Sequence, residues 1–247
     1  MSATAGALRL GLLGKLPAHG DFIRRGSLPA SFCTPWDAWL QDGIAAARAA
    51  IGEERWAGVW DAAPAWRFAL PPGACGPDAA AGVLLPSQDS VGRRFPLTLA
   101  AVREGPGADW PAAWFAVLEG VARTAFASGQ DADAVAALLP EPDVSSGGGV
   151  PVADAPPADP LAAFWATVAA ENDLEHAAAG VEPPDLSEPD AKAASAPDPA
   201  MIAGDPGDRA VPGWWTAAAA DGTLGLVWPL PALPAAEEFV LLLEAEA

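Results

Sequence analysis

The chain has 247 residues, of which 51% are hydrophobic, so it can bury one large core or two small ones. Its net charge of −19 should repel nucleic acids and anionic lipids, which excludes both as partners. Its longest apolar runs are too short to span a bilayer, and its first residues lack the pattern of a secretory signal. We therefore expect a cytoplasmic protein whose two cysteines, Cys33 and Cys75, stay reduced.

The negative charge is confined to the second half of the chain. Residues 1–129 hold 11 Lys and Arg against 11 Asp and Glu, whereas residues 130–247 hold two basic residues against 21 acidic ones. The first half is thus neutral as a whole, and its cations can form a local positive site.

Strands and helices alternate along the first half. Apolar residues alternate over residues 8–13, which predicts a strand that leads into a Gly- and Pro-rich loop. Thr34 and Pro35 have the pattern of a helix start, and apolar residues at helical spacing continue to Ile51, where Gly52 ends the helix. Further elements are expected as strands over residues 65–70, 82–85 and 95–102 and as helices over residues 109–128, capped by Asp109, and 133–139.

The composition changes at Pro140. Residues 140–210 are acidic and rich in Pro and Ala, so they have too little apolar surface to offset the entropy of ordering, and we expect an exposed, mobile segment with one helix around residues 160–178. The sequence becomes core-like again at Trp214 and Trp215, and a last helix is expected over residues 235–244. In an extended segment one of these adjacent tryptophans faces the core, while the other is exposed or covered by a second helix.

These elements indicate one α/β layered domain over residues 1–247, with its core in residues 7–139 and 211–247. We expect a central mixed β-sheet flanked by helices, and residues 140–210 as an acidic Pro/Ala-rich insertion.

Two stretches resemble catalytic motifs but lack an essential part of each. Gly14-Lys15 follows the first strand, yet a phosphate-binding loop requires Ser or Thr after the lysine, where this chain has Leu16. Ser87 lies between proline and glutamine rather than between the glycines of a nucleophile elbow. Neither nucleotide hydrolysis nor acyl transfer is expected here.

A metal-assisted hydrolase remains as an alternative. His19 and Asp21 lie two residues apart and could share a metal ion with Asp89. The only other histidine, His176, lies in the acidic segment. In the simpler interpretation Asp21 accepts hydrogen bonds from the turn or pairs with a neighbouring arginine.

Two adjacent arginines follow Gly92 at the start of an expected strand. Successive side chains of a strand point to opposite faces, so one of Arg93 and Arg94 points inward. An inward guanidinium requires a carboxylate partner, and Asp89 and Asp21 are the candidates. The loops at residues 14–26 and 86–94 are therefore predicted to meet at one edge of the sheet.

The cations left over on these loops could form a basic patch that suits an anionic surface or a phosphorylated residue, although they could equally be solvated surface charges. The patch is expected to contain one of the two arginines together with Lys15, Arg24 and Arg25.

Three stretches of the first half resemble one known family. They read GKLPAHGDFIRRGSLPASFCTPWDAWL, APAWRFALPPGACG and GVLLPSQDSVGRRFPLTL. In this order and spacing they resemble the TagF family, also called ImpM, which is associated with the bacterial type VI secretion system. The resemblance implies a compact α/β layered fold and a cytoplasmic, post-translational repressor of secretion. It also implies a link to a forkhead-associated scaffold protein and to the threonine kinase and phosphatase pathway that controls assembly.

We therefore expect a non-enzymatic regulator that binds a protein partner of the forkhead-associated scaffold type. No catalytic residue, metal or cofactor is expected, and the oligomeric state stays open. A structural adaptor that binds through the acidic arm at residues 130–212 is a further alternative. The residues expected to form the binding surface are Lys15, His19, Asp21, Arg24, Arg25, Ser87, Asp89, Arg93 and Arg94.

Overall fold

The structure is a computed structural model that describes residues 6–105, 110–142, 201–203, 210, 212–218 and 223–245. Residues 1–146 and 199–247 belong to one unit of the chain. All of residues 147–198 lie outside the described ranges, and so does the helix expected around residues 160–178.

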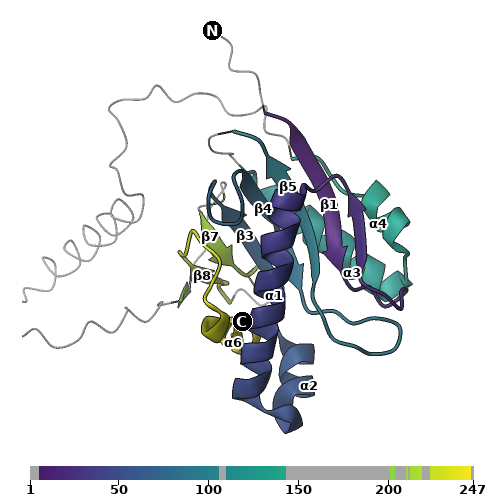
Figure 1. Cartoon of the computed structure of the whole chain (residues 1–247), viewed down its shortest axis with the longest axis vertical. Helices are drawn as coiled ribbons and strands as arrows, with labels where there is room; N and C mark the ends of the chain where they lie inside the picture. The colour runs from purple at the N-terminus through teal and green to yellow at the C-terminus, as the bar shows by residue number, and fades with distance from the viewer. Residues whose placement is uncertain are drawn as a thin grey trace, which may run out of the picture. The chain divides into compact units, whose positions relative to one another are not determined.

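An eight-stranded sheet forms the centre of the described unit (Figure 1). Its strand order is β2-β1-β5-β4-β3-β7-β8-β6. The strands are β1 (Leu8–Gly14), β2 (Ile23–Gly26), β3 (Trp66–Leu70), β4 (Ala79–Leu85), β5 (Leu97–Arg103), β6 (Ile202–Ala203), β7 (Gly213–Trp215) and β8 (Leu226–Trp228). The predicted α/β fold is confirmed, but all the described strand pairs are antiparallel rather than mixed in direction.

Helices cover both faces of this sheet. Helix α1 crosses one face, and α3 and α4 lie behind the other (Figure 1). The helical elements are α1 (Ala30–Ile51), α2 (Glu53–Ala62), α3 (Ala112–Ser128), α4 (Ala132–Ala137), the 3-10 turn η2 (Ala236–Glu238) and α6 (Phe239–Glu244). Because the sheet is covered on both sides, every residue of β4 is buried.

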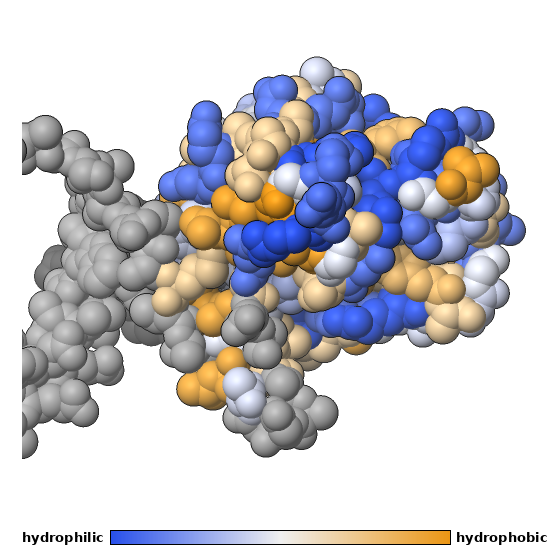
Figure 2. All heavy atoms as spheres, turned by 90° about the horizontal axis from the view of Figure 1, so that it is seen from below, coloured by the Kyte–Doolittle hydropathy of each residue, from blue (hydrophilic) through white to orange (hydrophobic). Residues whose placement is uncertain are grey.

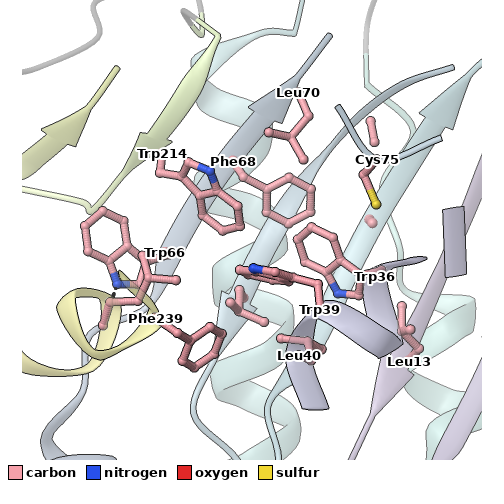
Figure 3. Close-up of a cluster of buried hydrophobic side chains, with 14 of the residues drawn as sticks. Leu13, Trp36, Trp39, Leu40, Trp66, Phe68, Leu70, Cys75, Trp214 and Phe239 are labelled. Atoms are coloured by element: carbon pink, nitrogen blue, oxygen red, sulfur yellow. Dashed lines mark hydrogen bonds between the residues drawn. The ribbon is translucent and has the colours of Figure 1, made fainter. Parts of the chain in front are cut away.

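Aromatic side chains fill the core on the α1 side. Trp36 stacks on Trp214 with ring centroids 5.9 Å apart, and it lies 4.6 Å from Phe68 (Figure 3). The neighbouring Trp215 is buried in the core on the α3 side. Both adjacent tryptophans are therefore buried, one on each face of the sheet. Of the two possibilities for the second tryptophan, exposure to solvent or cover by another helix, the structure shows cover.

The starts of two helices differ from the sequence-based expectation. Helix α1 begins at Ala30 rather than after Thr34, because the buried Phe32 and Cys33 lie on its first turns and anchor them to the core. Pro35 is consequently inside the helix. Helix α3 begins at Ala112 after Pro111, while Asp109, the expected cap, lies outside the described residues.

Strands β2 and β6 and helix α2 were not expected. Strand β6 lies within residues 140–210, the segment expected to be mobile, and pairs with β8 at the end of the sheet. Strand β2 forms within the predicted loop and pairs with β1, and its two arginines are typical of a charged edge strand. Helix α2 follows α1 directly, because Gly52 adopts a φ of 82° that ends one helix and allows the next to begin.

Candidate functional site

The loops at residues 14–26 and 86–94 lie side by side, as predicted. Gly14 at the end of β1 pairs with Leu97 at the start of β5, so both loops leave the sheet at the same edge (Figure 1). The Ser87 hydroxyl donates to the carbonyl oxygen of Lys15 at 2.8 Å. The backbone N–H of Ser90 donates to the carbonyl oxygen of His19 at 2.8 Å. These bonds join the two loops into one surface.

Asp89 is the centre of this junction, and its side chain is fully buried. Its Oδ2 accepts from Lys15 Nζ at 2.9 Å and from Arg93 Nε at 2.6 Å. Its Oδ1 accepts from the backbone N–H groups of Arg93 at 2.8 Å and Val91 at 3.1 Å. Burial alone raises the pKa of Asp89, but the hydrogen bonds from Lys15 and Arg93 outweigh it and hold this pKa well below the ordinary carboxyl value.

The two adjacent arginines point to different partners. The guanidinium of Arg93 binds Asp89 and also donates to the carbonyl oxygen of Gly20, so it ties the two loops together. Arg94 binds Asp61 of helix α2 through two hydrogen bonds of 2.8 and 3.1 Å. The predicted pairing of one arginine with Asp89 is confirmed, and the partner of the other lies on a helix that was not predicted.

The expected basic patch is largely neutralised by ion pairs. Arg25 pairs with Asp133 of helix α4 at 2.7 Å, and Lys15 is already bound to Asp89. Arg24 donates to the carbonyl oxygen of Leu28 at 2.7 Å, and within the described ranges it is the one cation of this set without a carboxylate partner. Asp21 is exposed and forms no ion pair with a described cation, so the expected bridge through Asp21 is absent from this part of the chain.

The candidate metal ligands do not converge in the described structure. The Nε2 of His19 accepts the backbone N–H of Ala132 at 2.9 Å, so its lone pair is occupied. Both oxygens of Asp89 are hydrogen-bonded, whereas Asp21 faces solvent. No group of three His, Cys, Asp or Glu side chains suited to a metal is found among the described residues. This geometry gives the metal-assisted alternative no support.

A surface hollow of about 240 Å³ adjoins the junction of the loops. The indole N–H of Trp60, on helix α2, donates to the carbonyl oxygen of Ser87 at 3.1 Å and fixes one wall. The hollow is lined by Pro17, Trp60, Asp61, Pro86, Ser87, Gln88 and Phe126. Sequence reasoning missed it because its walls come from four separate segments of the chain.

Sequence reasoning also missed two exposed apolar side chains on the same loops. Val91 is 70% exposed in the turn between Asp89 and Gly92, and Phe22 on the facing loop is 44% exposed. A signal was present, because turns favour Gly, Asn, Asp and Ser and a β-branched apolar residue in a turn is unusual. The two loops therefore present apolar as well as charged groups.

One family model and one solved structure are similar to this chain. The model described as "TagF N-terminal domain, Type VI secretion system-associated" matches residues 11–141, which is more than half of the chain. The crystal structure of PA0076 from Pseudomonas aeruginosa PAO1 is similar at 27% identity and a TM-score of 0.60, covering 96% of this chain and 95% of that one. The search among curated proteins returned no significant match. None of the described helices is long and apolar enough to cross a membrane.

Proposed function

Because the chain belongs to the TagF N-terminal domain family of type VI secretion system-associated proteins, we propose that it is a non-enzymatic, cytoplasmic regulator of that system. In this proposal it represses secretion after translation by holding a forkhead-associated scaffold protein in an inactive complex. The proposal rests on the resemblance and on the presence of a surface suited to a protein partner.

The junction of the two loops is the observation that carries this proposal. Asp89 is buried and binds Lys15 and Arg93, so two loops distant in sequence are held in one arrangement before any partner arrives. A preorganised surface loses less entropy on binding than two independent loops do. Functional residues are often found on loops that a rigid scaffold positions in this way.

The direct test is binding between the purified full chain and the purified forkhead-associated scaffold of the same bacterium. We expect saturable binding by calorimetry. Arg94→Glu should weaken it, because the variant breaks the ion pair with Asp61 and leaves two carboxylates side by side on the proposed surface.

Arg48→Glu is the matched control. Arg48 also binds an exposed acid, Glu53, through two hydrogen bonds, but it lies on helix α1 and its described side-chain hydrogen bonds go to Glu53 rather than to either loop. Arg93→Glu should weaken the complex as well, with circular dichroism to check folding because its neighbour Asp89 is buried. If both loop variants are folded and bind like the wild type, the proposed surface is wrong.

Regulation is tested separately in cells. Excess of the wild-type chain should lower the export of a type VI substrate, and Arg94→Glu should relieve this repression. Export that is unchanged by excess wild-type chain contradicts the regulatory role, whatever the binding result.

A further inference from the structure

Arg93 uses one edge of its guanidinium inside the chain and leaves the other edge open to solvent. Its Nε donates to Asp89 Oδ2 at 2.6 Å, and its Nη2 donates to the carbonyl oxygen of Gly20 on the facing loop. A guanidinium has five N–H donors, so the others have no acceptor among the described residues. The side chain is 61% exposed. Its outer edge therefore offers two parallel N–H groups, in a direction that the inner bonds fix.

The cluster around Asp89 carries more positive than negative charge. Lys15 Nζ binds the same carboxylate oxygen as Arg93, at 2.9 Å, so two cations share a single carboxylate. Asp21, the exposed carboxylate of the facing loop, forms no ion pair with a described cation. Lys15 is largely covered, whereas Arg93 is exposed, so the surplus positive charge faces solvent through the open edge of Arg93.

A free hydroxyl lies beside the same guanidinium. Ser90 is exposed, and its backbone N–H donates to the carbonyl oxygen of His19 at 2.8 Å, which holds the residue against the facing loop. Its Oγ lies 3.6 Å from the place that a Cβ on Gly20 would take, and Gly20 is the residue whose carbonyl oxygen binds Arg93. This hydroxyl forms no hydrogen bond with a described residue, so it can donate to a ligand held by Arg93.

We propose that the outer edge of Arg93 and the Ser90 hydroxyl bind the carboxylate of an Asp or Glu side chain of a protein partner. The two oxygens of a carboxylate match the two parallel N–H groups, and its single negative charge matches the surplus charge of the cluster. The inference rests on the proposed function and specifies the chemistry of its contact.

A phosphorylated residue fits this site less well than a carboxylate does. Phosphate carries close to two negative charges, and the sites that recognise it gather several arginines. Arg25 and Arg94 each bind a carboxylate of their own, and Arg24 donates to a backbone carbonyl oxygen. Among the arginines of the two loops, Arg93 is thus the one that combines an open edge with a shared carboxylate.

The ion pair is expected to be one contact within a wider interface. Hydrophilic residues cover much of the face seen in Figure 2, with smaller hydrophobic areas between them. Phe22 and Val91 are exposed apolar side chains on the same two loops. Apolar neighbours that exclude water from a charged hydrogen bond strengthen it, so these two side chains support the contact without specifying it.

The first experiment measures the Kd of the purified scaffold for the wild type and three variants. Arg93→Lys keeps the positive charge but loses the planar pair of N–H groups, so it should weaken binding at least about fivefold. Arg93→Gln loses the charge as well and should weaken binding at least about tenfold. Ser90→Ala should weaken it about two- to fivefold, because one neutral hydrogen bond is lost. Circular dichroism checks that each variant is folded.

Arg123→Gln is the matched control. Arg123 also shares a carboxylate, that of Glu119, with a second arginine, and its side chain is 63% exposed, but it lies on helix α3. The variant removes the same charge from the chain as Arg93→Gln does, and it should change the Kd less than about twofold. The inference is overturned if folded Arg93→Gln binds like the wild type, or if the two variants weaken binding equally.

A double-mutant cycle separates a direct contact from an effect of Arg93 on the loops. Exposed Asp and Glu residues of the scaffold are replaced one by one by Ala. One such variant should weaken binding to the wild type at least about tenfold and binding to Arg93→Gln less than about twofold. Scaffold binding in which no carboxylate is coupled to Arg93 overturns the inference and leaves the proposed function standing. A Kd that rises more than about tenfold after the scaffold is treated with phosphatase identifies the bound group as phosphate and also overturns it.

A pull-down from the native cytosol covers the case in which the scaffold does not bind. An identified protein that is retained by the wild type and by Arg123→Gln, is lost with Arg93→Gln, and has a carboxylate coupled to Arg93 in the same cycle supports the site and removes the scaffold as partner. Equal retention by all three chains, or retention of no protein by the wild type, overturns the site together with the proposed function.

Discussion

Phe239→Ala tests whether the C-terminal helix is part of the core. The Phe239 side chain is buried, contacts Trp39 with ring centroids 5.3 Å apart, and lies against Gly43 of α1, where a Cβ would come within 2.5 Å of the ring. Removing a buried phenylalanine ring costs about 3–5 kcal/mol in the free energy of unfolding. For a domain of this size each kcal/mol lowers Tm by about 2–4 °C, so we expect a decrease of about 6–20 °C.

Thermal unfolding followed by circular dichroism measures this decrease. Leu241→Ala is the control because Leu241 is 37% exposed on the same helix, and it should lower Tm by no more than about 2 °C. If Phe239→Ala lowers Tm as little as Leu241→Ala does, α6 does not pack as described and the core is complete without it.

The remaining predictions concern the site and the acidic segment. Asp89→Asn should lower Tm by at least about 5 °C, because Lys15 and Arg93 lose their carboxylate partner, and it should speed amide exchange at Val91 and Arg93, because a neutral amide oxygen accepts their N–H groups more weakly. The pKa of Asp89 is lower in the folded state than in the unfolded state. Ionised Asp89 therefore stabilises the fold fully above the ordinary carboxyl pKa of about 4, and this stabilisation is lost as the pH falls below it. The Tm difference between wild type and Asp89→Asn should accordingly stay constant above about pH 5 and shrink in acid. Titration with Mn²⁺, Mg²⁺ or Zn²⁺ should give no heat and no thermal shift, whereas a saturable shift lost in His19→Ala would restore the hydrolase alternative. Replacing residues 147–198 by a Gly-Ser linker should leave scaffold binding intact with an altered salt dependence, and loss of binding would favour the adaptor alternative.

Local patterns predicted the parts of the fold that local physics determines. Alternating leucines gave the first strand, and Gly52 and Gly129 marked the ends of two long helices where positive φ angles occur. Strand β2 was missed because a four-residue edge strand with two arginines has no apolar alternation. The sequence left open whether the second tryptophan is exposed or covered by a helix, and the cover on both faces of the sheet buries Trp215 as well as Trp214.

The candidate site was predictable only where charge requires a partner. The argument that an inward arginine needs a carboxylate predicted the pair of Asp89 and Arg93, but the structure buries the carboxylate and leaves the Arg93 side chain 61% exposed. The partners of Arg94 and Arg25 come from α2 and α4, so their identity depends on tertiary packing that no short pattern encodes.

The position of β7 in the sheet has a consequence for synthesis. Strand β3 has β7 as its neighbour on the side away from β4, and Ala69 pairs with Gly213, which leaves the ribosome about 140 residues later. At ordinary elongation rates this interval lasts on the order of 10 s, during which the nascent chain holds an open hydrogen-bonding edge and uncovered indole rings. Newly made chains are therefore expected to need chaperone protection until their last segment emerges.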